Sequence, residues 1–196
     1  MISIFKNREE LKKKVDLDNY YYFKKYFKDD EIDKIIKIAD KYTKISGTVS
    51  TTVDKSYRSS KIKWLPHNED TSWIYDKLSQ LTKIANKNSW EFDIIGFGED
   101  IQLGEYTAEE EGHYDWHLDI GGSVSWRKIS ISVQLSGPDE YEGGDLQFRT
   151  GRYVKTAPKD KGTVILFPSY FLHRITKITK GTRKSLVIWI SGHPFK

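Results

Sequence analysis

The spacing of apolar positions changes character near residue 88. Before this point, apolar residues recur every three or four positions, as on one face of a helix. This spacing predicts a helix from residue 29 to about 42, capped by Asp29 and Asp30, and a second helix over 71–86. The predicted apolar faces consist of Ile32, Ile35, Ile36, Ala39 and Tyr42 in the first helix, and Trp73, Ile74, Leu78, Leu81, Ile84 and Ala85 in the second.

Two other parts of the N-terminal half have extended character. Residues 20–23 predict a short strand, and residues 47–63, rich in Thr, Ser and Val, predict extended or loop structure. Within the second part, Ser46–Ser60 contains the small polar residues that suit a mobile cover over a site.

Beyond residue 88, short β-type segments are separated by Gly, Pro and Asp turns. The segments predict strands at 90–95, 101–106, 113–118, 127–135, 145–149, 152–156, 163–167, 171–175 and 184–191. Many short strands with regular turns are typical of a sandwich, barrel or jelly roll. Because the helices come first, we expect an α+β fold with the N-terminal helices packed on one sheet.

The composition fits a folded chain of moderate size. The 196 residues suit one domain, with a helical part at about 1–88 and a β-rich core at about 89–196. Hydrophobic residues make up 37% and aromatic residues 14%, which argues against disorder despite 31% charged residues.

Charge, cysteine content and hydropathy limit the partners and the cellular location that we expect for this protein. The 32 Lys and Arg exceed the 28 Asp and Glu by only four and are spread along the chain, so a nucleic-acid partner is not indicated. The absence of cysteine rules out disulfides and thiolate metal sites. No apolar run suits a signal peptide or a membrane span. We therefore expect a soluble, cytoplasmic protein without a membrane partner, and the sequence does not set its oligomeric state.

The candidate chemistry centres on the segment Tyr114-Asp-Trp-His117-Leu-Asp119. On extended backbone, His117 and Asp119 point to the same side of the chain. A third candidate ligand is His173. It follows an apolar segment and a turn at Pro168, at the start of a late strand. Early and late strands of a jelly roll face each other, so His173 can join the pair. Two His and one carboxylate leave open positions on a metal, as oxygen-activating non-haem Fe(II) requires.

Arg183 adds an independent part to this pattern. It lies ten residues after His173, behind a predicted turn at Lys180–Gly181, and opens the strand 184–191. A guanidinium fork is suited to holding a carboxylate inside a pocket. A dicarboxylate oxo-acid can therefore chelate the metal at one end and meet Arg183 at the other.

These residues, taken together, resemble a known family. The stretch from residue 106 to 189 is similar to the Fe(II)/2-oxoglutarate-dependent dioxygenases, specifically their prolyl 4-hydroxylase-like branch. The matching residues, in order, are Tyr106, Tyr114-Asp-Trp-His117-Leu-Asp119, Arg127, Glu142-Gly-Gly-Asp-Leu146, Gly162-Thr-Val-Ile-Leu-Phe-Pro168, His173, Gly181-Thr-Arg183 and Trp189.

The resemblance implies a role for each metal and cosubstrate residue. His117, Asp119 and His173 would ligate Fe(II), and Arg183 would pair with the distal carboxylate of 2-oxoglutarate. Tyr106 occupies the place of a tyrosine that lines the cosubstrate pocket, although residues 107–112 look like a small insertion. The position of Gln134 is commonly a tyrosine that bonds the cosubstrate; its amide retains a donor.

Three further residues match the peptidyl-proline site of prolyl hydroxylases. Tyr114, Arg127 and Trp189 would form an aromatic pair around a pyrrolidine and a donor to a peptide carbonyl. The implied reaction uses dioxygen, oxidises 2-oxoglutarate to succinate and CO₂ and hydroxylates an unactivated C–H, with ascorbate as a possible reductant. The expected partner is a proline-containing peptide or protein; another amino acid, peptide or small molecule remains an alternative substrate.

Other readings of the same residues remain open. His113 is expected at most at the pocket edge, because its four-residue spacing to His117 converges on a helix rather than a strand. A nucleic-acid demethylase of the same superfamily would usually carry a second arginine where residues 186–188 are apolar. A jelly-roll binding module without catalysis would rarely keep all four site residues, and a zinc hydrolase would give Arg183 no role.

Overall fold

Strand β14 (Ile178–Ser191) is the central element of the fold, because strands on both sides of it complete the larger sheet. The computed structural model describes residues 20–47 and 53–194. In the larger sheet the strands follow the order β1-β12-β8-β14-β6-β4-β2, and β5 and β9 also pair with β14. Their bounds are β1 Tyr21–Phe23, β2 Ile45–Ser46, β4 Lys61–Leu65, β5 Gly96–Phe97, β6 Ile101–Thr107, β8 Arg127–Gln134, β9 Tyr141–Gly143 and β12 Val164–Pro168.

A second sheet of five strands faces the first. Its order is β11-β10-β13-β7-β3, and all of its pairs are antiparallel. These strands span β3 Arg58–Ser59, β7 His113–His117, β10 Leu146–Thr150, β11 Tyr153–Thr156 and β13 Leu172–Ile175. A short 3₁₀ turn, η2 (Gly122–Val124), lies between β7 and β8. The expected jelly-roll core is confirmed.

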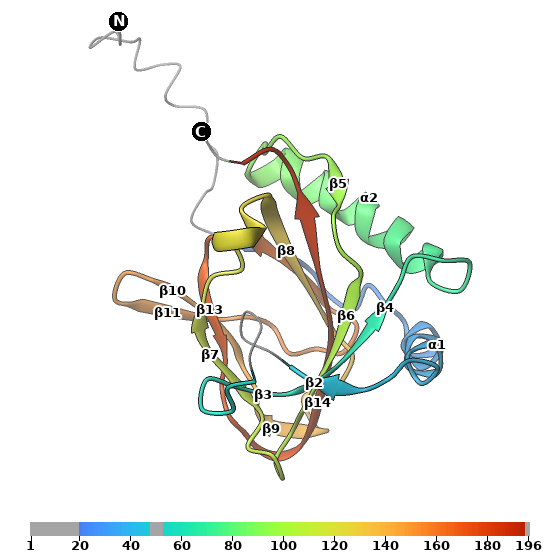
Figure 1. Ribbon diagram of the computed structural model, residues 1–196, viewed down its shortest axis with the longest axis vertical. Coiled ribbons are helices and arrows are strands. Elements are labelled where there is room, and N and C mark those ends of the chain that lie inside the picture. Colours follow the sequence, from blue (N-terminus) through green and yellow to red (C-terminus); the bar gives the residue numbers. More distant parts are fainter. Residues whose placement is uncertain (1–19, 48–52, 195–196) are drawn as a thin grey trace, which may run out of the picture.

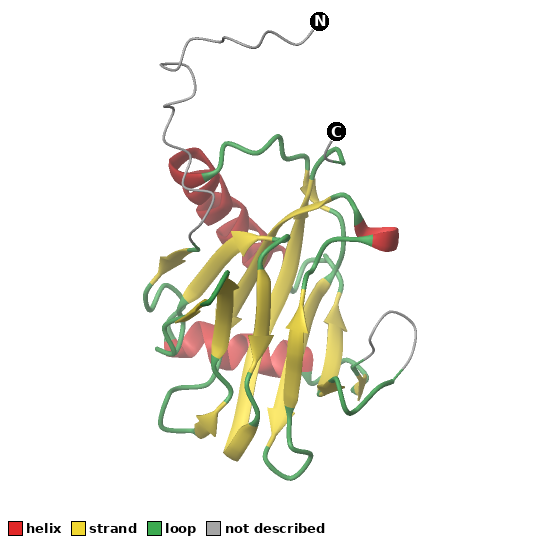
Figure 2. Cartoon of the chain, turned by 90° about the vertical axis from the view of Figure 1, so that its left-hand side faces the viewer, coloured by secondary structure: helices red, strands yellow, loops and turns green. Residues whose placement is uncertain are grey.

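Helices α1 (Asp29–Ala39) and α2 (Ser72–Ser89) cover the outer face of the larger sheet, away from the five-stranded sheet (Figure 1). Figure 2, turned by 90°, shows both helices behind the strands. Their buried residues, among them Ile35 and Leu78, join one core with apolar residues of β8, β12 and β14. The prediction that the helices pack on one sheet is therefore confirmed.

Side-chain alternation gives the larger sheet two different faces. In β8, Ile129, Ile131 and Val133 pack in the core beneath the helices. In β12, Val164 and Leu166 join that core, whereas Ile165 and Phe167 join a second core between the two sheets. Both faces of β12 are thus covered, which explains its uninterrupted apolar run. The opposite face of β8 carries polar residues, and that of β14 carries Arg183 and Ser185 together with Val187 and Trp189.

The N-terminal half contributes strands as well as helices. Strand β1 pairs with β12, β3 with β7, and β4 with β6, so segments before residue 66 are built into both sheets. The polar stretch 47–63 thus contains two strands, and its residues 48–52 lie outside the described part of the chain. The cover proposed for Ser46–Ser60 therefore lies partly outside the described residues.

Several local expectations differ from the structure. Lys28, rather than Asp29 or Asp30, occupies the N-cap of α1; Glu31 accepts a hydrogen bond from the Lys28 backbone, and the helix ends at Ala39. Residues 90–95 form no strand, and β9 was not predicted. The expected turn at Lys180–Gly181 is also absent, because Gly181 takes a positive φ of 72° inside β14, opposite Tyr141.

None of the helices in the described ranges, 20–47 and 53–194, has the length and apolar character needed to cross a membrane.

Candidate metal and cosubstrate site

His117 and His173 lie directly opposite each other on two neighbouring strands. Strand β7 presents His117 and β13 presents His173 as register partners, with ring centroids 4.1 Å apart. The register then shifts, so that Ile175 pairs with Tyr114 rather than with Asp115. This irregularity re-aims the side chains of β7, and both Tyr114 and His117 line the same cavity.

Asp119 lies two residues beyond β7 and reaches both imidazoles. Its Oδ1 is 3.7 Å from His117 Nε2, and its Oδ2 is 3.5 Å from His173 Nε2. The Asp119 backbone N–H donates to Ser169 O at 3.0 Å, which ties this segment to the β12–β13 turn. The Ser130 hydroxyl donates to Asp119 Oδ2 at 2.6 Å and lies 3.0 Å from Ser169 Oγ. Buried residues of three segments therefore fix the carboxylate.

Backbone carbonyls set the imidazole tautomers. His117 Nδ1 lies 2.7 Å from Asp115 O, and His173 Nδ1 lies 2.8 Å from Phe171 O. A carbonyl can only accept, so each Nδ1 carries the proton and each Nε2 keeps its lone pair. Burial, followed by the proximity of His173, lowers the pKa of His117 to about 3. His117 is therefore neutral near pH 7.

The carboxyl group of Asp119 stays ionised in the same cluster. Burial raises its pKa, but His173, His117 and the Ser130 hydrogen bond outweigh burial and bring the pKa below its ordinary value. One ligand atom from each of His117, Asp119 and His173 lies within 4.8 Å of the others. Two imidazoles and one carboxylate, each oriented by an outer hydrogen bond, fit a divalent metal such as Fe(II).

Arg183 is the most buried cation of the site, with 1% of its surface exposed. Its Nη1 donates to Ser185 Oγ and its Nη2 to Gln134 Oε1, both at 3.0 Å, and its buried Nε has no hydrogen-bond partner. Within residues 20–47 and 53–194, no carboxylate forms an ion pair with Arg183. A buried guanidinium held only by neutral acceptors fits an anionic ligand that supplies the missing charge.

A cavity of about 610 Å³ joins the metal-ligand group to Arg183. Its walls come from both sheets and from the η2 segment. They include His117, Asp119, His173 and Arg183 together with Tyr106, Tyr114, Arg127, Phe167, Ser185 and Trp189. The volume lies in the range of small-molecule sites. The arrangement can hold a metal at one point and a carboxylate at another.

Tyr106 and Gln134, the two other residues predicted to contact the cosubstrate, differ in their position relative to the cavity. Tyr106 lines the cavity, and the Arg183 guanidinium lies 5.6 Å from its ring centroid. Gln134 does not line the cavity. Its Oε1 accepts from Arg183, and its Nε2 donates to Pro158 O at 3.4 Å. The Gln134 amide thus contacts the arginine rather than the space in which a cosubstrate would lie.

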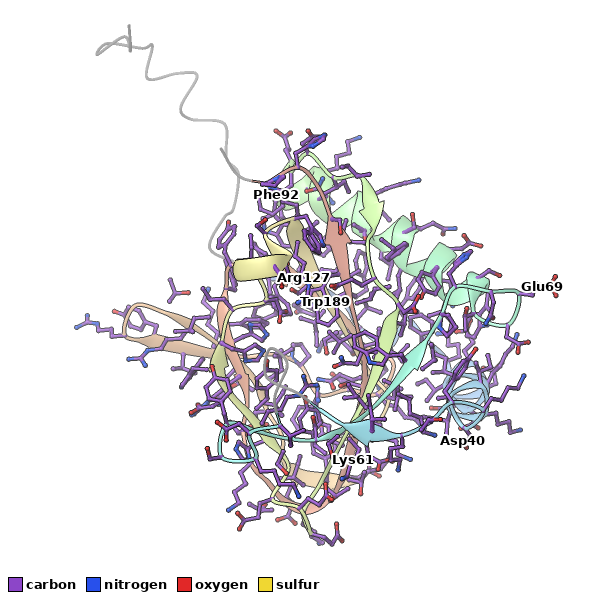
Figure 3. The ribbon with its side chains drawn as sticks, viewed as in Figure 1. Asp40, Lys61, Glu69, Phe92, Arg127 and Trp189 are labelled. Carbon is purple, nitrogen blue, oxygen red and sulfur yellow. The ribbon has the colours of Figure 1, made fainter. Side chains whose placement is uncertain are left out.

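The three residues predicted for substrate contact all line the cavity. Tyr114 stacks on His117, with ring centroids 3.5 Å apart, and burial raises the pKa of Tyr114 to about 12. The Arg127 guanidinium lies 3.7 Å from the Trp189 ring centroid, and Figure 3 labels both residues. Arg127 also donates two 2.8 Å hydrogen bonds to Glu99 and one to Asp119 O. Its charge is therefore balanced within the protein.

The N-terminal half supplies cavity residues that sequence reasoning missed. Tyr57, Arg58 and Trp64 come from the segment before α2, and Gln102 comes from β6. Arg58 is buried, and its guanidinium lies 4.6 Å from the Tyr114 ring centroid. No spacing in the sequence relates Arg58 to the metal-ligand motif, because β3 reaches the site by pairing with β7. His113 lies outside the cavity wall, with its ring nitrogens near Glu111 O and Ser56 O.

Comparison with known proteins shows a similarity over the C-terminal half of the chain. Residues 101–191 match the model of the 2OG-Fe(II) oxygenase superfamily. A PKHD-type hydroxylase of Teredinibacter turnerae is 36% identical over 87 residues, which are 41% of this chain and 38% of the relative. Another, from a Synechococcus species, is 34% identical over 119 residues, or 58% of this chain and 54% of the relative. The matched segments thus span about two fifths to one half of these hydroxylases.

Two solved structures share the fold over most of the chain. A Pseudomonas putida prolyl-4-hydroxylase superposes with a TM-score of 0.70 and 18% identity, covering 88% of this chain and 92% of the other. A Trichoplax adhaerens prolyl hydroxylase, in complex with a peptide fragment of a hypoxia inducible factor, superposes with a TM-score of 0.75 and 14% identity. The match covers 93% of this chain and 86% of the other. The family of the matched segment implies Fe(II), 2-oxoglutarate and dioxygen, for which the ligand group and Arg183 are suited. Residues 101–191 of this chain are thus similar to the 2OG-Fe(II) oxygenase superfamily.

Proposed function

We propose that this protein is an Fe(II)- and 2-oxoglutarate-dependent dioxygenase that hydroxylates an unactivated C–H bond. The observation that carries the proposal is one cavity containing both the His117, Asp119 and His173 group and Arg183, a buried arginine without a carboxylate partner among the described residues. The balanced reaction converts substrate, dioxygen and 2-oxoglutarate to hydroxylated substrate, succinate and CO₂.

The protein residues have distinct tasks in this proposal. His117, Asp119 and His173 would hold Fe(II), which would supply the activation of dioxygen. Arg183 would bind the distal carboxylate of 2-oxoglutarate, with Tyr106 as part of the wall beside it. Gln134 and Ser185 would orient the Arg183 guanidinium. The cavity walls would limit water around the reacting groups.

The proposed substrate is a peptidyl proline, hydroxylated as by a prolyl 4-hydroxylase. Tyr114 and Trp189 offer aromatic surface at the cavity wall, where a pyrrolidine ring would pack. The buried Trp189 side chain also interacts with the Asp119 carboxylate and helps to lower its pKa, so this wall adjoins the ligand group. The similarity of the fold to two prolyl hydroxylases, one solved with a peptide, supports a peptide or protein partner.

We also propose that the chain forms a single domain. Strands β1, β3 and β4 from the N-terminal half pair with β12, β7 and β6 of the core. Helices α1 and α2 share a core with those strands. Limited proteolysis tests this organisation, because separate domains would yield a stable fragment that begins near residue 89.

The direct test of the proposed activity is anaerobic addition of 2-oxoglutarate to the Fe(II)-loaded protein. A visible charge-transfer band from the chelated keto acid is expected, and it should be lost in His173→Ala. Succinate release and a mass increase of one oxygen in a prolyl peptide would then test the substrate. If iron binds and no band forms, the dioxygenase proposal is wrong.

A further inference from the structure

In the described part of the chain, helices cover the outer face of the larger sheet but not that of the five-stranded sheet (Figure 2). The inner face of the five-stranded sheet carries His117 and His173, which line the cavity. Because side chains alternate along a strand, their neighbours Trp116 and Arg174 lie on the outer face. One face of these strands thus belongs to the cavity, and the other faces solvent.

The arginines that lie outside the cavity gather on this outer face and at its edge. In the described part of the chain, three arginines line the cavity wall, and the others are Arg149 in β10, Arg152 in the turn before β11, and Arg174 in β13. Strands β10, β11 and β13, together with the turn between the first two, contain no Asp or Glu. Arginine is enriched at protein interfaces, whereas lysine is depleted there. The position of the three arginines therefore distinguishes this face from the rest of the described surface, where the cations are lysines.

None of these three guanidiniums forms an ion pair with a carboxylate of the described residues. Arg174 Nε donates to Gln147 Oε1 at 2.9 Å, and Arg149 Nε donates to a backbone carbonyl of the hairpin turn at 3.2 Å. Arg152 Nη2 donates to the Tyr153 hydroxyl at 3.0 Å. Every acceptor is neutral, so these hydrogen bonds orient the guanidiniums without offsetting their charge.

Two of these arginines lie beside the same indole ring. The Arg174 guanidinium is 4.6 Å and the Arg149 guanidinium 6.0 Å from the Trp116 ring centroid. Two like charges at one ring repel each other, so an anion that binds both of them would be stabilised. Asp115, the only carboxylate in the five strands, accepts instead from the Trp116 backbone N–H.

Exposed apolar side chains border the arginines. Val154, the register partner of Arg149, is 48% exposed, and Tyr153 is 63% exposed. Leu118, just beyond β7, is 49% exposed and also lines the cavity, so this face borders the cavity. Arginine and aromatic residues beside exposed apolar ones are the composition of a protein-binding surface.

We propose that this surface, the arginine face, made of Trp116, Arg149, Arg152, Val154 and Arg174, docks an acidic segment of a protein partner. The carboxylates of Asp and Glu side chains match the guanidinium fork and supply the missing negative charge. Apolar side chains of the same segment would pack on Val154 and its neighbours. The docking surface is independent of the proposed dioxygenase activity, because it rests on residues outside the cavity.

A nucleic acid, the other common polyanion, fits the arginine face less well. The whole chain carries a net charge of only +4, whereas nucleic-acid binding draws on many cations. The Arg174 guanidinium also lies over the Trp116 ring, where a base would have to stack. The acidic peptide segment is therefore the occupant that the charges and the apolar residues favour together.

Fluorescence anisotropy on the full chain tests the proposal with three labelled probes. The acidic probe is a short peptide of Asp, Glu and Leu, the neutral probe has Asn and Gln in place of Asp and Glu, and the third is a single-stranded DNA of the same charge as the acidic peptide. The acidic peptide should bind at least about tenfold more tightly than the neutral one, and added salt should weaken it. Equal binding of the two peptides, no binding of the acidic peptide, or tighter binding of the DNA would overturn the proposal.

The double variant Arg149→Gln with Arg174→Gln should weaken the acidic peptide about tenfold and leave the neutral peptide unchanged. The matched control is Lys83→Gln with Lys87→Gln, which removes the same charge from exposed positions of α2. Replacing both arginines by Lys keeps the charge without the guanidinium forks and should restore only part of the affinity. An equal loss in the α2 control, or no loss in the arginine variant, would contradict the arginine face.

A second measurement locates the bound peptide on the unmodified protein. The indole N–H signal of Trp116 in ¹⁵N-labelled protein, assigned by its absence in Trp116→Phe, should shift on titration with the acidic peptide and stay in place with the neutral one. The indole of Trp90, buried beneath the helices, is the internal control and should not move. No shift at Trp116, or the same shift with both peptides, would overturn the proposal. Neither titration depends on catalysis, so the outcome is separate from that of the 2-oxoglutarate band.

Discussion

His117 and His173 are register partners across β7 and β13, with their ring centroids 4.1 Å apart. Residues 56 positions apart in sequence are thus joined by one antiparallel pair, and the third proposed ligand, Asp119, is held by the turn that precedes β13. Backbone hydrogen bonds therefore set the spacing of the ligand group before any metal arrives.

Replacement of His173 by Ala should abolish Fe(II) binding, because it removes one of three ligand atoms and leaves Asp119 with a single imidazole partner. Anaerobic titration calorimetry with Fe(II) measures the effect. His67→Ala is the matched control, since His67 is exposed and lies outside the ligand group. Retained stoichiometric iron binding in His173→Ala would remove His173 from the ligand set.

Replacement of Ser130 by Ala should weaken metal binding about 10- to 100-fold, because the 2.6 Å hydrogen bond to Asp119 Oδ2 is lost and the carboxylate is no longer oriented. Ser130→Thr keeps the hydroxyl and should bind metal within a few-fold of the wild type. Competition with a chelator of known affinity gives the constants. If Ser130→Ala and Ser130→Thr bind metal with the same affinity, the hydrogen bond does not act on the metal site.

Replacement of Arg183 by Gln should leave Fe(II) bound and weaken 2-oxoglutarate at least about tenfold, because a charge-assisted contact to the distal carboxylate is lost. The visible band, titrated anaerobically, reports the dissociation constant. Binding of pyruvate, a keto acid without a distal carboxylate, should change little in the variant. An unaltered 2-oxoglutarate affinity would show that Arg183 has another role.

Replacement of Gln134 by Glu should also weaken 2-oxoglutarate, for a different reason. The new carboxylate would replace the neutral oxygen that accepts from Arg183 Nη2 at 3.0 Å, and it would offset the charge that the cosubstrate needs. Gln134→Leu removes the hydrogen bond without adding charge and should have a smaller effect. The same titration compares the two variants. A larger loss of 2-oxoglutarate affinity in Gln134→Leu than in Gln134→Glu would argue against charge competition.

Replacement of Tyr75 by Phe should lower the free energy of unfolding by about 1–3 kcal/mol, because two buried backbone groups lose their partner. The Tyr75 hydroxyl donates to Leu65 O and accepts from Ile101 N–H, both at 3.0 Å, and so joins α2 to the ends of β4 and β6. Urea denaturation measures the change. Tyr153→Phe, at an exposed position of β11, should be neutral by comparison.

Alternation along the strands made much of the fold predictable. The apolar positions of β8 alternate with polar ones because one face packs beneath the helices and the other faces the space between the sheets. The segment 90–95 misled the prediction, although its composition suits a strand. Glu91 takes a positive φ of 51°, and the Asn86 side chain bonds both backbone groups of Phe92, so no strand partner can use them.

The candidate site was predictable only where its residues share a motif or a family resemblance. The spacing of His117 and Asp119 identifies them as candidate ligands. His173 and Arg183 are identified by their positions in the order of residues shared with the family. Arg58 has no such signal, because β3 is two residues long and its place beside β7 is set by tertiary pairing. Gln134 was assigned to the cosubstrate from its position in the family, whereas its amide is engaged by Arg183 and Pro158.

The length of β14 between Arg183 and Trp189 has a consequence for how such a protein can diversify. Both residues line the cavity from one continuous strand, six positions apart, which corresponds to about 20 Å of extended chain. Neighbouring strands pair with β14 along this whole interval. The separation between Arg183 and Trp189 is therefore fixed by the sheet. Changes in the surrounding loops can alter what enters the cavity without altering how far apart its two ends stand.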